Sequence, residues 1–411
     1  MTTENVMPLR VLIFHIRISM GHERAAQALA AAFRCRGYSD IRLVEAIGHS
    51  SGWLAPVVCR SYMSVVKYVP ALWDFLYDDP RATAAAERLL RYWTRRSRAN
   101  FLRLMADVRP HLVICTQALP ARILAKLKER GDGREAGMEA PVFAVVTDFS
   151  IHRYWAAPEI DGYFLPGASE RQKLVSMGVP SEKISCTGIP IPPEMADPVS
   201  ESDLERARRL FGLHPGRPTL LLMGGSRGVG LKSDLMKELE HLPYPVNILA
   251  PAGTNLAALE ELCRWSASSR HRVVPLEYRT DIRELYALSD VAITKPGGLT
   301  LAECMAVGLP MVIQHAMPGQ EQHNLEFVRS SNLAEIGTDA SDVAARVNAL
   351  LMNPARLQHL RLRLKSSARP DAAFAIVDQL LRRFPVLPAR SGTASAAAAA
   401  RPQTLCPSLG H

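Results

Sequence analysis

The sequence lacks any long uninterrupted apolar run, and this limits how the protein can meet a membrane. No run reaches the roughly 18 residues that a helix needs to cross a bilayer. The opening segment, Met1 to Asn5, also lacks the basic and then apolar regions of a secretory signal. We therefore expect a cytoplasmic protein.

Metal-binding patterns are missing as well. The seven cysteines are scattered without a C-x-x-C pair, which argues against a zinc site and against a disulfide framework. No D-x-D triplet occurs, and no cluster of His, Cys and Asp has the spacing of metal ligands. We expect no metal site and no required cofactor, although counts of acidic residues alone do not exclude Mg²⁺.

What the chain does have is a globular composition with an uneven charge. It has 411 residues, 48% of them hydrophobic and 22% charged, which suits two domains of ordinary size. Between Arg81 and Arg109 there are eight arginines, opposed only by Glu87 and Asp107. This stretch predicts a basic surface for an anionic partner. No nucleic-acid-binding motif accompanies it, so nucleic acid is not the expected partner.

Buried strands are predicted in two successive series that alternate with helical patterns. This alternation predicts an α/β fold with two mostly parallel sheets and helices on both of their faces. The expected strands are 10–14, 41–44, 112–115, 142–146 and 163–165 in the first series, and 219–223, 246–250, 271–275, 291–294 and 311–313 in the second.

A Pro-rich passage at 188–193 separates the two series and suits a connection between domains. We place an N-terminal domain at 1–193 and a C-terminal domain at 194–385, and expect the last helix to pack back toward the N-terminal domain. The segment 386–411 is rich in Ala, Ser, Pro and Arg and is expected to be disordered.

Three polar segments follow strands of the second series, where ligands of such sheets bind. The turn 223–230 is rich in glycine, which lets backbone amides approach a phosphate, although such a turn alone can be structural. A second glycine pair follows the strand 291–294 and precedes Glu303, a carboxylate suited to ribose hydroxyls. The segment 317–324 is dense in side chains that bind hydroxyl groups.

These segments together resemble a known family. The run 293–324, with K-P-G-G-L-T-x-x-E, G-L-P and P-G-Q-E-x-x-N, resembles the monogalactosyldiacylglycerol synthases and the processive diacylglycerol glucosyltransferases of glycosyltransferase family 28. A more distant likeness is to the N-acetylglucosaminyltransferase of peptidoglycan precursor synthesis. In the first half, the V-V-T-D at 145–148 with His152 and Trp155 agrees. The resemblance spans about 10–384 and implies a GT-B fold, with two Rossmann-like domains facing each other across a cleft.

The resemblance also implies roles for particular residues. The second domain would bind a UDP-sugar, with glycines and a helix start around the diphosphate, Glu303 on the ribose and polar side chains on the sugar. The donor-binding residues implied in this way are Gly225, Ser226, Gly298, Leu299, Thr300, Glu303, Gln320, Glu321 and Asn324. Thr300 is also expected to cap the helix that follows.

The loop after the first strand contains Gly21 and His22, and the family has a histidine here that faces the donor. His22 is our candidate general base, since an ordinary histidine pKa near ~6.5 suits deprotonation of an acceptor hydroxyl. A histidine at a helix start can instead cap or pack. Asp148 is the competing base, or it orients a histidine or an acceptor hydroxyl. Arg17 and Ser19 stand where the family has small residues, which leaves the acceptor open.

The region before and within the arginine stretch is rich in aromatic residues. In the lipid glycosyltransferases the equivalent region meets the membrane, and aromatics beside arginines suit a headgroup surface. The alternative is a helical subdomain whose aromatics form a core. The residues assigned to acceptor or membrane contact are Gly21, His152, Trp155, Trp73, Trp93, Arg95 and Arg96.

The resemblance implies an inverting enzyme, peripheral at the inner face of the membrane, that transfers glucose or galactose from its UDP form to diacylglycerol as a β-glycoside. An enzyme of the same class with another lipid or a secondary-metabolite acceptor is the first alternative. A non-catalytic sugar-nucleotide-binding protein is the second. The expected partners are therefore UDP-glucose or UDP-galactose, a lipid acceptor and an anionic membrane surface.

Overall fold

The fold divides into two compact units. A computed structural model describes residues 9–17, 20–50, 95, 97–129, 139–225, 228, 230–231, 233–280, 282–314, 316 and 319–384. The first unit comprises Met1–Pro193, Met317–Asn324 and Arg369–Ser391, and the second comprises Glu194–Ala316, Leu325–Ala368 and Gly392–His411. The tail 386–411, predicted to be disordered, lies outside the described residues.

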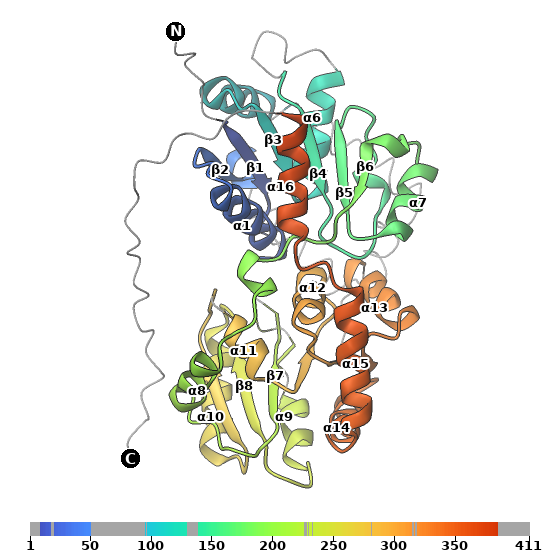
Figure 1. Cartoon of the computed structure of the whole chain (residues 1–411). Helices are drawn as coiled ribbons and strands as arrows, with labels where there is room; N and C mark the ends of the chain where they lie inside the picture. Colours follow the sequence, from blue (N-terminus) through green and yellow to red (C-terminus); the bar gives the residue numbers. More distant parts are fainter. Residues whose placement is uncertain are drawn as a thin grey trace. The chain divides into compact units, whose positions relative to one another are not determined.

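The first unit is built on a sheet of six parallel strands in the order β2-β1-β3-β4-β5-β6 (Figure 1). Its strands are short and mostly buried, as expected for a sheet that is covered on both faces. They are β1 (Val11–His15), β2 (Ile41–Glu45), β3 (Leu112–Cys115), β4 (Val142–Val145), β5 (Gly162–Leu165) and β6 (Ile184–Cys186).

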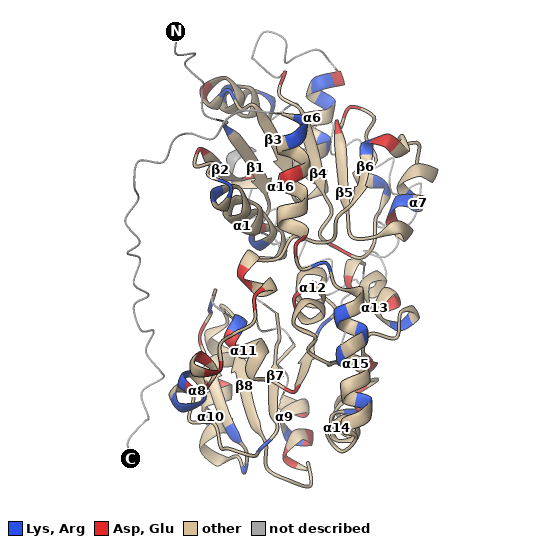
Figure 2. Cartoon of the chain, in the orientation of Figure 1, with Lys and Arg blue, Asp and Glu red and all other residues tan. Residues whose placement is uncertain are grey.

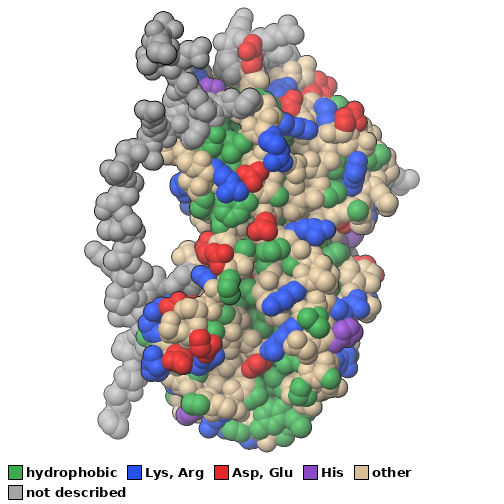
Figure 3. All heavy atoms as spheres, in the orientation of Figure 1, with side chains coloured by type: hydrophobic (Ala, Val, Ile, Leu, Met, Phe, Trp, Pro, Cys, Tyr) green, Lys and Arg blue, Asp and Glu red, His purple; other side chains and the backbone are tan. Residues whose placement is uncertain are grey.

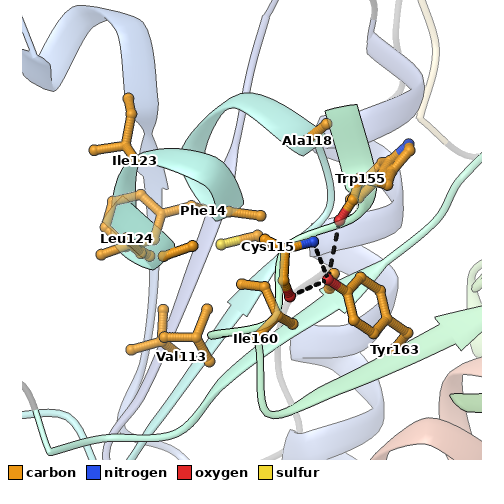
Figure 4. Close-up of a cluster of buried hydrophobic side chains, with 14 of the residues drawn as sticks. Phe14, Val113, Cys115, Ala118, Ile123, Leu124, Trp155, Ile160 and Tyr163 are labelled. Carbon is orange, nitrogen blue, oxygen red and sulfur yellow. Dashed lines mark hydrogen bonds between the residues drawn. The ribbon is translucent and has the colours of Figure 1, made fainter. Parts of the chain in front are cut away.

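Alternate residues of these strands enter two different cores, one on each face of the sheet. Leu12 and Phe14 of β1 belong to one core, and Val11 and Ile13 to the other. Figure 4 shows the first of these cores, where Phe14 packs near Leu124. The helices of this unit are α1 (Met20–Cys35), α2 (Ala46–Ser50), a helix over 97–108, α6 (Ala118–Glu129), α7 (Ala168–Ser176) and α16 (Ala372–Arg383), with 3₁₀ turns η1 (Arg153–Trp155) and η2 (Ser181–Lys183).

The last helix, α16, belongs to the first unit although it comes from the far end of the chain. It packs beside α1 and buries Ile376, Val377 and Leu380 in the second of the two cores. Arg36 at the end of α1 binds both carboxylate oxygens of Asp378, at 2.7 and 2.9 Å. The predicted return of the last helix to the first half of the chain therefore has a structural basis in apolar packing and one ion pair.

The second unit contains another sheet of six parallel strands, in the order β12-β11-β10-β7-β8-β9. Its strands are β7 (Thr219–Leu222), β8 (Asn247–Pro251), β9 (Arg272–Leu276), β10 (Val291–Thr294), β11 (Met311–Ile313) and β12 (Glu335–Ile336). Its helices are α8 (Glu201–Leu210), α9 (Ser233–Glu240), α10 (Leu256–Ser268), α11 (Arg283–Leu288), α12 (Gly298–Val307), α14 (Ala340–Leu351) and α15 (Pro354–Ser367), preceded by a 3₁₀ turn η3 (Pro193–Ala196). The helix α13 (Gln320–Ser330) is divided between the units, since its residues up to Asn324 belong to the first unit and the rest to the second.

The predicted α/β class with two parallel sheets is confirmed, and every strand that the sequence predicts is present. Two strands were not predicted, β6 and β12, and each is the outermost strand at one edge of its sheet. The segment Met317–Asn324 also groups with the first unit, whereas the predicted boundary assigned it to the second domain.

The described surface carries charges of both signs. Figure 2 shows acidic and basic residues on α8, while α15 carries only basic ones. On the face drawn in Figure 3, charged and hydrophobic side chains alternate over both units. Among the residues that the structure describes, no helix is both long and apolar enough to span a bilayer.

Candidate active site

Each sheet has one point where the strand order reverses, and ligands of open parallel sheets bind outside the carboxyl ends of the strands at such a point. In the first unit the reversal lies between β1 and β3, and in the second it lies between β7 and β10. A ligand is therefore expected beside the segments that leave these four strands. These segments contain His22, Thr116, Gly225 and Lys295.

His22 lies in the first turn of α1, directly after β1, with Gly21 beside it. Its side chain is buried, and its Nδ1 lies 2.8 Å from the hydroxyl oxygen of Thr147, just beyond β4. The carbonyl of His22 accepts a hydrogen bond of 2.9 Å from the hydroxyl of Thr116, just beyond β3. Three neighbouring strands thus fix the position of this imidazole.

The imidazole of His22 is neutral at physiological pH. Burial disfavours the imidazolium form and lowers the pKa of His22 to about 4, against a smaller raising effect of the Thr116 backbone. A general base must be unprotonated before it acts, and His22 meets that condition. Its pKa of about 4 lies below the ordinary value on which the sequence argument rested, so it is a weaker base than a histidine that titrates near neutral pH. His15, at the end of β1, is also buried, and burial lowers its pKa too.

Asp148 is held by two side-chain amides from α13. The Nε2 of Gln320 donates to one carboxylate oxygen at 3.1 Å, and the Nδ2 of Asn324 donates to the other at 3.0 Å. The N–H of Phe149 donates to the Oδ1 of Asn324 at 2.8 Å, which fixes the orientation of that amide. Asp148 therefore anchors the first turn of α13 within the first unit, a pairing that sequence reasoning missed.

The carboxyl of Asp148 titrates close to neutral pH. Burial raises the pKa of Asp148 to about 6; its hydrogen bond with Asn324 lowers the pKa, and the negative charge of Glu321 raises it further. Both oxygens accept hydrogen bonds from amide groups, so the ionised form is the one that this arrangement fits.

Trp155, predicted to meet the acceptor or the membrane, is a core residue. Its indole is 3% exposed and packs with Ile160 and Tyr163 (Figure 4). The hydroxyl of Tyr163 donates to the carbonyl of Trp155 at 2.9 Å, which fixes the backbone here. The prediction is wrong in so far as it placed this side chain at a lipid surface. His152 lies beside it, half-buried, and burial lowers the pKa of His152 to about 3, with a smaller effect of His323.

The second unit places a glycine-rich turn directly after β7. Gly225 and Gly228 have φ angles of 76° and 63°, which glycine adopts without strain. A Cβ on Gly224 would come within 2.9 Å of the backbone of Gly228, so the turn is too tight for a side chain there. Beside it lies Lys295, since a Cβ built on Gly225 would be 3.7 Å from the Lys295 ammonium nitrogen. Lys295 was part of the recognised motif, but the sequence assigned it no role.

The helix α12 begins at Gly298, immediately after β10, with Gly297 as its N-cap. Thr300 therefore lies inside the first turn. The prediction that Thr300 caps this helix is wrong, because Gly297 is the N-cap. Leu299 is buried, and Glu303 is buried one turn further on. The hydroxyl of Tyr286, from α11, donates to an oxygen of Glu303 at 2.7 Å. Tyr286 lies outside the sequence motifs, so the sequence did not indicate that it contacts Glu303.

Ser226, Trp73, Trp93 and Arg96 lie outside the described residues. Of the basic stretch, the structure describes four arginines, all of them exposed: Arg95, Arg98, Arg103 and Arg109. Within the described chain, no group of three or more His, Cys, Asp or Glu side chains has the geometry of a metal site.

A parallel α/β unit with a buried, neutral histidine at its reversal point, joined in one chain to another with a glycine-rich turn and a buried glutamate, suits an enzyme that binds a nucleotide. Solved structures with this fold include MurG of Acinetobacter baumannii, with a TM-score of 0.58 and 15% identity over 91% of this chain and 99% of that one. They also include Staphylococcus aureus MnaA with UDP, with a TM-score of 0.60 and 14% identity over 95% and 100%. These likenesses confirm the GT-B type of fold.

The sequence comparisons are more specific. A family model of monogalactosyldiacylglycerol (MGDG) synthase matches residues 22–191, and a model of the glycosyltransferase family 28 C-terminal domain matches residues 219–374. Relatives named processive diacylglycerol beta-glucosyltransferase include one from Bacillus cereus (strain AH187), 28% identical over 92% of this chain and 95% of the relative. One from Bacillus thuringiensis (strain Al Hakam) is 27% identical over the same shares. Together the two models identify the chain as a glycosyltransferase that resembles the monogalactosyldiacylglycerol synthases and family 28, as predicted.

Proposed function

We propose that the protein transfers a hexose from a UDP-sugar to the hydroxyl of diacylglycerol, with inversion at the anomeric carbon. Relatives with that acceptor in their name align with nearly the whole chain. The fold alone is less selective, because a UDP-GlcNAc 2-epimerase from Neisseria meningitidis shares it with a TM-score of 0.55. The observation that carries the proposal is the neutral, buried imidazole of His22 at the reversal point of the first sheet.

His22 is proposed as the general base. If its Nδ1–H donates to the hydroxyl oxygen of Thr147, the lone pair of Nε2 is left to accept a proton. The acceptor oxygen loses its proton to Nε2 and attacks the anomeric carbon. The bond from that carbon to the phosphate oxygen breaks, and UDP leaves. Attack opposite the leaving group converts an α-linked donor into a β-glycoside.

The second unit is proposed to hold the donor. Backbone amides around Gly225 and the start of α12 at Gly298 suit a diphosphate, with the ammonium group of Lys295 adding positive charge. Glu303, oriented by Tyr286, suits the ribose hydroxyls. The amides at Leu299 and Thr300 belong to the same helix start. A structure of Anabaena HepE in complex with UDP-glucose, 12% identical, has the same fold with a TM-score of 0.53.

Asp148 is proposed as a positioning residue. Because its two oxygens accept from Gln320 and Asn324, it holds the first turn of α13 in place, including Glu321. In this role it orders the residues that the family resemblance assigns to the sugar, and His22 performs the proton transfer.

Peripheral contact with an anionic membrane surface is part of the proposal. It is supported by the exposure of Arg95, Arg98 and Arg103 along one helix whose Phe101 and Met105 are buried. Each basic residue near such a surface contributes about 1 kcal/mol to binding. Co-sedimentation with vesicles containing anionic lipid, compared with purely zwitterionic vesicles, tests it. Equal binding to both would count against the membrane role of this helix.

The function is tested by incubating the purified chain with UDP-glucose or UDP-galactose and vesicles containing diacylglycerol, with and without EDTA, and measuring lipid products by mass. A diacylglycerol gain of one hexose, unaffected by EDTA, is expected. Arg17 favours testing a second acceptor class, because it is exposed and paired with Glu23 in the loop where the family has small residues. A total lipid extract should therefore be assayed in parallel. Release of UDP with the extract and none with diacylglycerol would move the assignment to another acceptor.

A further inference from the structure

The end of β11 carries a polar side chain with no assigned role. Gln314 follows β11 directly, and its backbone N–H donates to the carbonyl of Thr294 at the end of β10 at 3.0 Å. The side chain is partly exposed, but its amide nitrogen Nε2 is shut off from solvent. No atom of the described residues accepts a hydrogen bond from that nitrogen.

A buried amide donor without an acceptor costs free energy, so its presence in a folded protein requires an explanation. Solvent-facing glutamines avoid this cost by turning their amide toward water. The amide nitrogen of Gln314 is not turned toward water but lies inside the second unit.

The Nε2 of Gln314 lies beside the glycine-rich turn that follows β7. A Cβ built on Gly230 would be 3.2 Å from Gln314 Nε2 and 3.4 Å from Lys295 Cγ. A Cβ built on Gly225 would be 3.2 Å from Lys295 Cε. Gln314, Lys295 and the turn therefore adjoin one another, at the carboxyl ends of three adjacent strands, β11, β10 and β7.

This cluster combines an ammonium group, an amide donor and glycines whose backbone a ligand can approach closely. The side chain placed beside Gln314 Nε2 at Gly230 is that of Lys295, which carries a positive charge. The complementary ligand is a compact anion with several acceptor oxygens, which is the chemistry of a phosphate. Asp or Glu at position 314 would oppose such a ligand, while Gln supports it without adding charge.

We infer that Gln314 is a donor-binding residue, and that its Nε2 donates a hydrogen bond to a phosphate oxygen of the nucleoside diphosphate held by the second unit. The inference rests on the proposed function and adds a residue that neither the sequence motifs nor the family resemblance singled out. It also predicts that Gln314 discriminates between nucleosides with and without phosphate.

The test compares Gln314→Leu, which removes the donor at similar size, with Gln314→Glu, which adds a negative charge. The matched control is Gln358→Leu, on the exposed side of α15 in the same unit. Binding of UDP is measured by titration calorimetry and binding of uridine by ligand-observed NMR, all with the full chain. Urea unfolding of each variant verifies that the fold is intact.

We expect Gln314→Leu to weaken UDP binding about tenfold, a typical effect of losing one hydrogen bond to a charged group. Gln314→Glu should weaken it further, and uridine should bind all proteins alike. Unchanged UDP affinity in either Gln314 variant would overturn the inference. So would equal losses for UDP and uridine, because the side chain would then shape the unit and not contact phosphate. A wild-type chain that does not bind UDP at all would overturn the proposed function itself, a result distinct from the others.

Discussion

Tyr286 and Glu303 are both buried and are joined by a hydrogen bond of 2.7 Å from the phenolic hydroxyl to a carboxylate oxygen. The two residues come from different helices, α11 and α12, of the second unit. A carboxylate that receives this bond on one oxygen is turned in a fixed direction. If Glu303 binds the ribose, Tyr286 sets the angle at which it does so.

Replacing Tyr286 with Phe should therefore raise KM for the UDP-sugar by about tenfold or more, the value of one hydrogen bond to a charged group. The turnover number should change little, because the reacting atoms are untouched. The matched control is Tyr244→Phe, which removes a hydroxyl bonded to Asn348 elsewhere in the same unit. The substitution Tyr286→Phe should reduce the affinity for a 2′-deoxyribose donor less than it reduces the affinity for UDP-glucose. An equal loss of affinity for both donors would contradict the assignment of Glu303 to the ribose hydroxyls.

Thr147 is expected to act through the imidazole of His22, whose Nδ1 is 2.8 Å from its hydroxyl oxygen. Thr147→Val should lower kcat about tenfold with little change in KM, since the correct tautomer is no longer fixed. Thr147→Ser keeps the hydroxyl and should retain most activity. Steady-state kinetics of the two variants decide the point. Similar losses in both would indicate packing by the Thr147 methyl group.

The pH dependence of kcat/KM separates the roles of Asp148 and His22. Asp148 has a pKa of about 6 and His22 one of about 4. Activity should fall as the pH decreases through about 6, because the protonated carboxyl of Asp148 no longer accepts from both Gln320 and Asn324. In Asp148→Asn the fall in kcat/KM near pH 6 should disappear. A reduced activity should persist until the pH approaches the pKa of His22, about 4. Retention of the fall near pH 6 in Asp148→Asn would assign it to another group.

The stability of the protein should also depend on pH. His22 and His152 have folded-state pKa values of about 4 and about 3, below the ordinary value of 6.5. The unfolded chain then binds more protons between pH 6.5 and 4, so the free energy of unfolding falls as the pH decreases through that window. Asp148, whose pKa is raised from 3.8 to about 6, works in the opposite direction over much of the same range. Because two histidines lower the free energy of unfolding and one carboxyl raises it, the protein should lose stability as the pH decreases from 6.5 to 4.

Urea titrations at pH 7 and pH 5 measure this loss. A variant with both His22→Gln and His152→Gln should lose less stability between the two values than the wild type does. The control His359→Gln, exposed on α15, should behave like the wild type. An identical pH dependence in the double variant would contradict the assignment of the loss to these two imidazoles.

Much of the fold follows from local sequence patterns. Runs such as Leu112–Cys115 and Thr219–Leu222 are uniformly buried and short, so their apolar character marks them as central strands. The missed strands show the limit of that signal. Only Ile184 is buried in the segment Ile184–Cys186, and neither residue of Glu335–Ile336 is buried, because an edge strand is covered less than a central one. Neither segment therefore has the apolar run that marks a central strand.

The candidate site was less predictable, because its contacts join distant parts of the chain. Asp148 and Asn324 are separated by 176 residues, and nothing in either local motif indicates that one donates to the other. Tyr286 and Gln314 lie outside the recognised motifs and become relevant only through what they face. Trp155 shows the reverse error, since an aromatic residue in a polar segment was assigned to a surface and is buried.

The most direct test of the central claim measures UDP affinity and hexose transfer together in wild type and His22→Ala. If the neutral imidazole of His22 takes the acceptor proton, the variant should bind UDP with an unchanged Kd and transfer hexose roughly 10²–10⁴-fold more slowly. A variant that binds UDP equally well and still transfers hexose at the rate of the wild type would contradict the account.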